Sequence, residues 1–153
     1  MRLSELISRE TGVGYDHIMF LRHSNENIRA LQGRGGSVEE YTVVQPTDTR
    51  YDLLHPKKPP VHVLVVIVHD RVSQVYKIEG VDREGTTYTL VSGANRMFDI
   101  ERKRREKPAR RYLVSVLPSK ATGRPISGWT SPRVAVARHG GRLFEQVTVE
   151  GLQ

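Results

Sequence analysis

The sequence predicts an α+β fold, with short N-terminal helices packed on a curled antiparallel β-sheet or a small barrel. Apolar residues recur at helical spacing only in the first third of the chain. From residue 61 onward, apolar or alternating segments of strand length are separated by turn residues. A segment rich in proline and charge, residues 46–60, divides the two patterns. Helices followed by a run of strands are typical of α+β domains.

The chain of 153 residues is expected to form one domain, 1–153, with a helical part at 1–45 and a β-rich part at 61–150. A hydrophobic content of 37% is enough for one core and too high for a disordered chain. The longest apolar run, residues 61–68, is far shorter than the roughly 20 residues that span a bilayer, so we expect no membrane partner. The absence of cysteine excludes disulfides and thiolate metal sites, and fits a cytoplasmic protein.

Three short helices are predicted before the proline-rich segment. In the first, Leu3, Leu6 and Ile7 share one face, and Gly12 ends it. Pro46 closes the third helix, which opens with a serine and two glutamates. The predicted ranges are 2–10, 26–33 and 37–45, with an apolar strand at 17–23 between the first two.

Strands dominate the rest of the chain. A tight turn at Asp70–Arg71 joins the first two strands into a hairpin, and a second hairpin is expected to turn at Gly140–Gly141. Residues 94–105 fit either a helix or an irregular loop. The predicted strands are 61–70, 73–81, 86–92 and 110–118, and the second hairpin covers 133–151.

The formal net charge of +7 favours a polyanionic partner. An anionic membrane surface would call for a basic amphipathic helix with bulky apolar residues opposite the charges, and this pattern is not evident. Nucleic acid is therefore the better candidate, and we interpret the chain as a single nucleic-acid-binding domain.

The segment 96–111 holds eight basic and three acidic residues. Arginine forks bind phosphate bidentately, and each neutralised phosphate releases counterions. We expect four consecutive residues to position phosphates: Arg102, Lys103, Arg104 and Arg105. The alternative is a solvated helix or loop that only keeps the protein soluble.

A concave pocket is predicted from residues outside this run. Trp129, the only tryptophan, lies in a loop rich in glycine, serine and proline, where it can stack on a base or plug the end of a barrel. Arg22 and His23 lie where a strand meets a helix start, a place suited to anions, although Arg22 can equally form a structural ion pair. Tyr76 and Arg96 complete the predicted pocket.

Signals for catalysis or metal binding are weak. There is no phosphate-binding glycine loop, no nucleophile elbow and no metal-binding histidine spacing. His62 and His69 flank the longest strand and are expected to face opposite sides of it. We therefore predict no catalytic residue, no metal and no cofactor.

Four short motifs occur together: LSEL at 3–6, LRH at 21–23, VYKIEG at 75–80, and Trp129. In combination they resemble the N-terminal domain of certain bacterial GIY-YIG nuclease-family and restriction-endonuclease-like proteins. The resemblance implies a PUA-like recognition domain that precedes a separate nuclease. The chain lacks a second domain with the GIY and YIG tripeptides, so we expect a fragment of a longer nuclease or a stand-alone binder.

The expected function is non-catalytic DNA binding, as the recognition domain of a restriction or defence nuclease, with a pocket for a modified or flipped base. Two alternatives stay open for the chemistry: a small metal-dependent nuclease, and a PUA-like domain that binds RNA. A third is a protein-interaction module whose charge is incidental.

Overall fold

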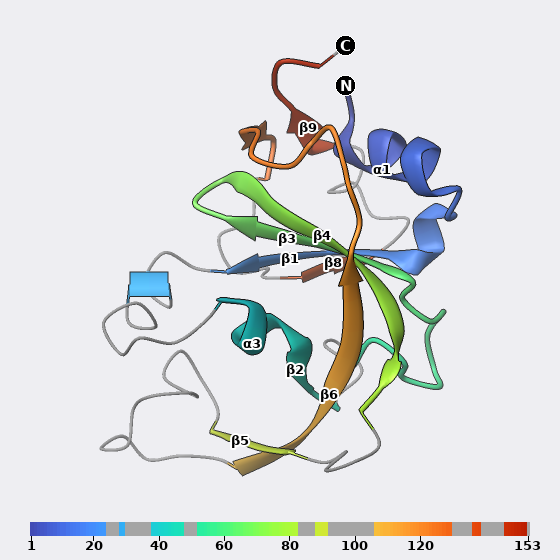
Figure 1. Cartoon of the computed structure of the whole chain (residues 1–153), viewed down its shortest axis with the longest axis vertical. Helices are drawn as coiled ribbons and strands as arrows, with labels where there is room; N and C mark the ends of the chain where they lie inside the picture. The colour runs from blue at the N-terminus through green and yellow to red at the C-terminus, as the bar shows by residue number, and fades with distance from the viewer. Residues whose placement is uncertain are drawn as a thin grey trace.

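The structure is a computed structural model that describes residues 1–23, 28–29, 38–47, 52–82, 88–91, 106–129, 136–138 and 146–152. In chain order, the described elements are α1 (Leu3–Thr11), the 3-10 helix η1 (Tyr15–His17), β1 (Ile18–His23), α3 (Val38–Val43), β2 (Val44–Pro46), β3 (Val63–Val68), β4 (Arg71–Val81), β5 (Tyr88–Val91), β6 (Glu106–Val116), β7 (Ile126–Ser127), β8 (Val136–Arg138) and β9 (Thr148–Val149) (Figure 1).

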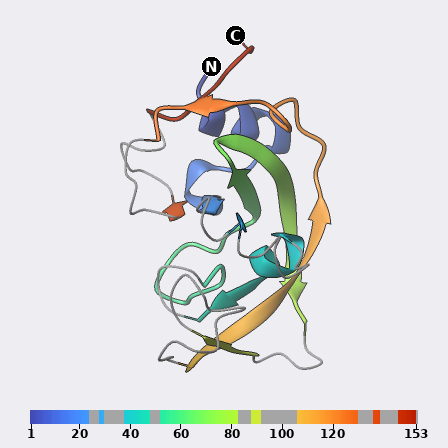
Figure 2. The same ribbon diagram turned by 90° about the vertical axis from the view of Figure 1, so that its left-hand side faces the viewer.

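The main sheet is curled and mixed. Its strands follow the order β2-β6-β4-β3-β1-β8, and β5 also pairs with β6. Strand β6 pairs with β5 near its start and with β4 near its end, and it curves between them (Figures 1 and 2). The predicted α+β class with a curled sheet is confirmed. The expectation of purely antiparallel pairing is wrong, because β1 and β3 are parallel, which the long connection between them permits.

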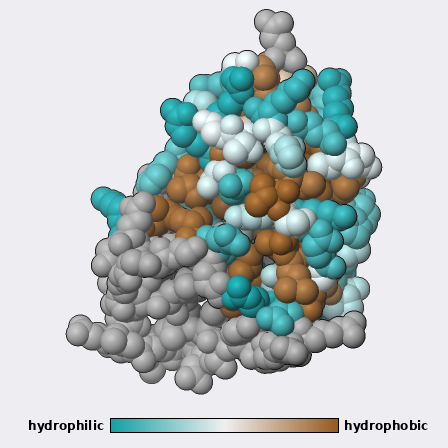
Figure 3. Space-filling view, in the orientation of Figure 1, coloured by the Kyte–Doolittle hydropathy of each residue, from teal (hydrophilic) through white to brown (hydrophobic). Residues whose placement is uncertain are grey.

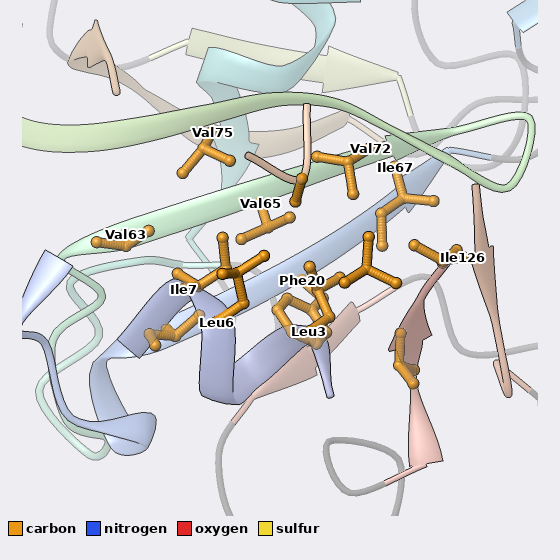
Figure 4. Close-up of a cluster of buried hydrophobic side chains, with 14 residues drawn as sticks. Leu3, Leu6, Ile7, Phe20, Val63, Val65, Ile67, Val72, Val75 and Ile126 are labelled. Atoms are coloured by element: carbon orange, nitrogen blue, oxygen red, sulfur yellow. The ribbon is translucent and has the colours of Figure 1, made fainter. Parts of the chain in front are cut away.

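Helix α1 covers one face of this sheet. Leu3 and Ile7 are fully buried and Leu6 nearly so, as their helical spacing predicted. They pack on the inward side chains of β1, β3 and β4, among them Phe20 and Val65 (Figure 4). The helix ends at Gly12, which adopts a left-handed conformation and donates its N–H to the Ser8 carbonyl at 2.8 Å. The buried apolar side chains of α1 and the side chains of these three strands that face it belong to one core, which we call cluster 1.

A second core cluster, cluster 2, lies on the opposite face of the sheet. It joins Met19, Leu64 and Tyr76 to Tyr112 of β6 and to Leu53. Leu53 belongs to the segment expected to be only a connector, yet it is fully buried. The sequence did not indicate that this segment contributes to the core, because it is rich in charge and proline. It supplies single buried side chains and not a periodic apolar face.

Other predicted boundaries also change. The third helix ends at Val43, and the next residues form β2, which pairs with β6. The strand predicted at 110–118 begins earlier, at Glu106. The described parts of the predicted hairpin 133–151 pair with other strands, since β8 pairs with β1 and β9 pairs with β7, while residues 139–145 lie outside the described residues. Of the predicted second helix only residues 28–29 are described, and the turn at 140–141 lies outside the described residues.

The two ends of the described chain lie side by side above α1 (Figure 1). The Met1 ammonium group donates to the Leu152 carbonyl at 3.2 Å. Apolar patches also reach the surface in the view of Figure 3, and the exposed large apolar residues among those described are Tyr15, Leu113 and Val116. In the part of the chain that the structure describes, no helix is long and apolar enough to span a bilayer.

Candidate functional site

The turn between β3 and β4 places the carboxylate of Asp70 beside strand β1. Two residues, His69 and Asp70, form the turn with φ angles of 51° and 55°. A two-residue hairpin with both φ angles positive follows the twist of the strands, and aspartate tolerates this region better than most residues. Asp70 is thereby placed beside Arg22, with Oδ1 at 2.9 Å from Nη2.

Arg22 also lies over the indole of Trp129. Its guanidinium carbon is 5.6 Å from the ring centroid, within cation–π range. Trp129 itself is half-buried and packs against cluster 1. Asp70 and Trp129 therefore hold Arg22 from two sides, while its side chain is still 28% exposed to solvent. The structure brings together these two predicted residues, which lie over a hundred positions apart in the sequence.

Two further arginines lie at the same end of the sheet. Arg71 Nη1 donates to the Gly123 carbonyl at 3.1 Å, and Arg124 Nε donates to the Lys120 carbonyl at 3.0 Å. Arg124 Nη1 also reaches the Gly151 carbonyl at 3.4 Å. Among the described residues no carboxylate pairs with either guanidinium, so each charge is held in position but not neutralised.

We call this region the hairpin-end surface. Backbone hydrogen bonds fasten the 120–127 segment to the start of β4: the Val72 N–H donates to the Arg124 carbonyl at 3.0 Å, and the Gly123 N–H donates to the Val72 carbonyl at 2.7 Å. Sequence reasoning missed Arg71 and Arg124, because isolated basic residues in separate segments give no local charge run. The surface consists of Arg22, Asp70, Arg71, Lys120, Arg124 and Trp129.

His23 points away from this surface. Its Nε2 lies 2.8 Å from the Thr42 hydroxyl of α3, and that hydroxyl donates to the Val38 carbonyl at 2.7 Å. Since the hydroxyl proton is used in this way, His23 Nε2 carries a proton and donates. The buried imidazole thus links β1 to α3.

Tyr76 is buried on the same face as His23, in cluster 2. Burial, with a smaller effect of Glu39, raises its pKa above the ordinary tyrosine value. The expectation that Arg22, His23 and Tyr76 line one pocket is therefore wrong, because adjacent residues of a strand project to opposite faces of the sheet. Among the predicted pocket residues that the structure describes, Arg22 and Trp129 are the two that meet.

The last part of the basic segment 96–111 lies in strand β6. Glu106, at the start of β6, pairs with Val91 of β5. At the end of the basic segment, Arg110 pairs with Asp52 at 3.1 Å and Arg111 with Asp82 at 4.0 Å, so both have acidic partners. Five predicted residues lie outside the described residues: Arg96, Arg102, Lys103, Arg104 and Arg105.

Asp52 is a buried carboxylate that the sequence did not reveal. It is 1% exposed, and it accepts hydrogen bonds from the Tyr112 hydroxyl, the Arg110 guanidinium and the Leu54 N–H. The Tyr112 oxygen in turn accepts from the Leu53 N–H at 3.2 Å. Burial, followed by the bond to Asp52, raises the pKa of Tyr112 well above its ordinary value. This network fixes the connector on β6 and keeps the Asp52 carboxylate buried.

Within the described ranges, no three histidine or acidic side chains gather as metal ligands. His17 and His62 do stack, with ring centroids 4.6 Å apart, and His17 Nδ1 lies 2.7 Å from the Pro60 carbonyl. Comparison of the chain with protein-family models, curated proteins and solved structures finds no match. The site must therefore be interpreted from its own geometry.

Proposed function

We propose that this protein is a non-catalytic DNA-binding domain that contacts DNA through its hairpin-end surface. The proposal rests on three arginines from distant segments near the β3–β4 turn. Arg22 pairs with Asp70 of that turn, and Arg71 and Arg124 are bonded to carbonyls of the 120–124 segment and of Gly151. Arg71 and Arg124 are held by backbone carbonyls, with no carboxylate partner among the described residues. Such pre-positioned charges suit phosphate oxygens, which release counterions when they are neutralised.

Trp129 gives this surface a means of binding bases as well as phosphates. Aromatic rings and guanidinium planes both stack on nucleobases. Since Arg22 lies over the indole, a base that enters here meets Arg22 first, with Trp129 as its support. The same proposal includes an electrostatic contribution from four consecutive basic residues, which add four positive charges: Arg102, Lys103, Arg104 and Arg105.

The finer proposal concerns the biological setting. The LSEL, LRH and VYKIEG motifs favour a PUA-like recognition domain of a restriction or defence nuclease, and a curled sheet is compatible with that fold. In such a role the chain selects the DNA and a separate domain cuts it.

The test is a titration followed by the fluorescence of Trp129, the only tryptophan. Single-stranded and duplex DNA should each change the emission saturably at about 50 mM salt, and added salt should reverse the change. Competition with structured RNA decides between DNA and RNA as the preferred ligand. If neither the emission nor the anisotropy of labelled DNA changes, the proposal is wrong. Cleavage of DNA by the pure chain with Mg²⁺, mapped to one acidic residue, would instead favour a nuclease.

A further inference from the structure

The Arg22–Asp70 pair differs electrostatically from the other arginines of the hairpin-end surface. Its two charges lie 2.9 Å apart and largely cancel. The Asp70 side chain is 59% exposed, so a phosphate that approaches Arg22 also meets a carboxylate of the same sign. The pair therefore suits a neutral polar group, whereas Arg71 and Arg124 suit phosphates.

Both members of the pair retain hydrogen-bonding capacity. Among the described residues, the Asp70 carboxylate makes one polar contact, through Oδ1, and the Arg22 guanidinium makes one, through Nη2. A carboxylate accepts at two oxygens and a guanidinium donates five N–H groups in a fork. Considering only the described residues, Asp70 Oδ2 and the remaining Arg22 N–H groups stay available as an acceptor beside donors, and the Trp129 indole lies under Arg22.

Guanine is the base whose edge fits this arrangement. Its N1–H and N2 amino groups are adjacent donors that one carboxylate can accept together, and O6 beside them is an acceptor that arginine recognises. Adenine and cytosine have one amino group next to a ring acceptor, and thymine has one ring N–H. None of these three offers two adjacent donor groups to the carboxylate.

We propose that Asp70 and Arg22 bind the Watson–Crick edge of an unpaired guanine. The proposal rests on the proposed DNA-binding function and adds a base preference to it. The guanine must be in a single strand or flipped out of a duplex, because base pairing occupies its N1 and N2 donors. Arg71 and Arg124 bind the neighbouring phosphates whatever the base.

The experiment uses short oligothymidylates with one central dG, dA, dC or deoxyinosine, titrated while Trp129 emission is followed. The dG oligomer should bind about tenfold more tightly than the dA oligomer. Deoxyinosine lacks the N2 amino group and should fall between them. The variant Asp70→Asn should lose the preference for dG, since its amide places a donor opposite a donor, while binding of pure oligothymidylate is retained. Asparagine accepts the left-handed turn, so the fold is preserved, and thermal melting checks this.

The matched control is Glu79→Gln, which removes the same charge from an exposed position on β4. It should leave the preference for dG intact. Equal binding of all four oligomers by the unaltered protein overturns the guanine assignment while DNA binding stands. An Asp70→Asn variant that binds every oligomer more tightly and still prefers dG also overturns it, since Asp70 then only competes with phosphate. Failure to bind any oligomer overturns the proposed function itself.

Discussion

The charge of the hairpin-end surface can be measured as a salt dependence. We consider the double variant Arg71→Gln/Arg124→Gln, which removes two positive charges and keeps an amide donor for each carbonyl acceptor. Each phosphate contact contributes about 0.9 to the slope of log K against log salt for duplex DNA. If each arginine neutralises one phosphate, the slope should become shallower by about 1.8. Between 50 and 200 mM salt, the unaltered protein should then lose about twelvefold more affinity than the variant.

The assay is fluorescence anisotropy of a labelled duplex at four or five salt concentrations, with unfolding curves to show that both proteins remain folded. The control variant is Lys57→Gln/Lys58→Gln, which removes the same charge from two exposed lysines outside the hairpin-end surface. A general effect of net charge would act equally in both variants. The reasoning is refuted if the arginine variant keeps the slope of the unaltered protein, or if the two variants change the slope equally.

The remaining predictions concern stability and the other site residues. Tyr112→Phe should lower the free energy of unfolding by about 1–3 kcal/mol in urea, because the Leu53 N–H and Asp52 lose a buried partner. Because the pKa of Tyr112 is raised in the folded state, the folded protein keeps the Tyr112 proton at a pH where the unfolded chain releases it. The free energy of unfolding should therefore fall as pH rises above about 10, by up to about 1.4 kcal/mol per pH unit. The fall should be less steep in Tyr112→Phe. Replacing residues 102–105 by alanine should weaken duplex binding alike at all sequences and flatten its salt dependence, and an unchanged salt slope would contradict a phosphate role. Trp129→Ala should weaken DNA binding more than Trp129→Phe, and the same loss should occur in Arg22→Ala; normal binding by a folded Trp129→Ala would make the indole purely structural.

Local patterns in the sequence were sufficient to predict the helices and strands whose apolar residues recur at a regular spacing. The spacing of Leu3, Leu6 and Ile7 predicted α1, and the turn predicted at Asp70–Arg71 marked the β3–β4 hairpin, although the turn lies one residue earlier, at His69–Asp70. Partners of short strands were not predictable in this way. Strands β8 and β9 have three and two residues, too few for periodicity, and their pairing with β1 and β7 depends on the whole fold.

The candidate site was predictable only in part, for the same reason. Trp129 and Arg22 stood out by rarity and by position, and the structure brings them into contact. His23 stood out equally, but the alternation of the strand turns it to the other face. No local pattern marks Asp52 as buried, and only the fold brings Tyr112 and Arg110, about sixty residues later, around it.

The turn at His69 and Asp70 has a consequence for efforts to engineer this protein. Both residues have left-handed backbone angles, which cost most side chains about 1 kcal/mol or more, aspartate and asparagine less, and glycine nothing. A screen for thermostable variants should therefore select Asn-Gly at these two positions, because that dipeptide relaxes the turn. Such a variant would melt at a higher temperature yet lack the carboxylate that faces Arg22. At this turn, selection for stability and selection for ligand discrimination should favour different sequences.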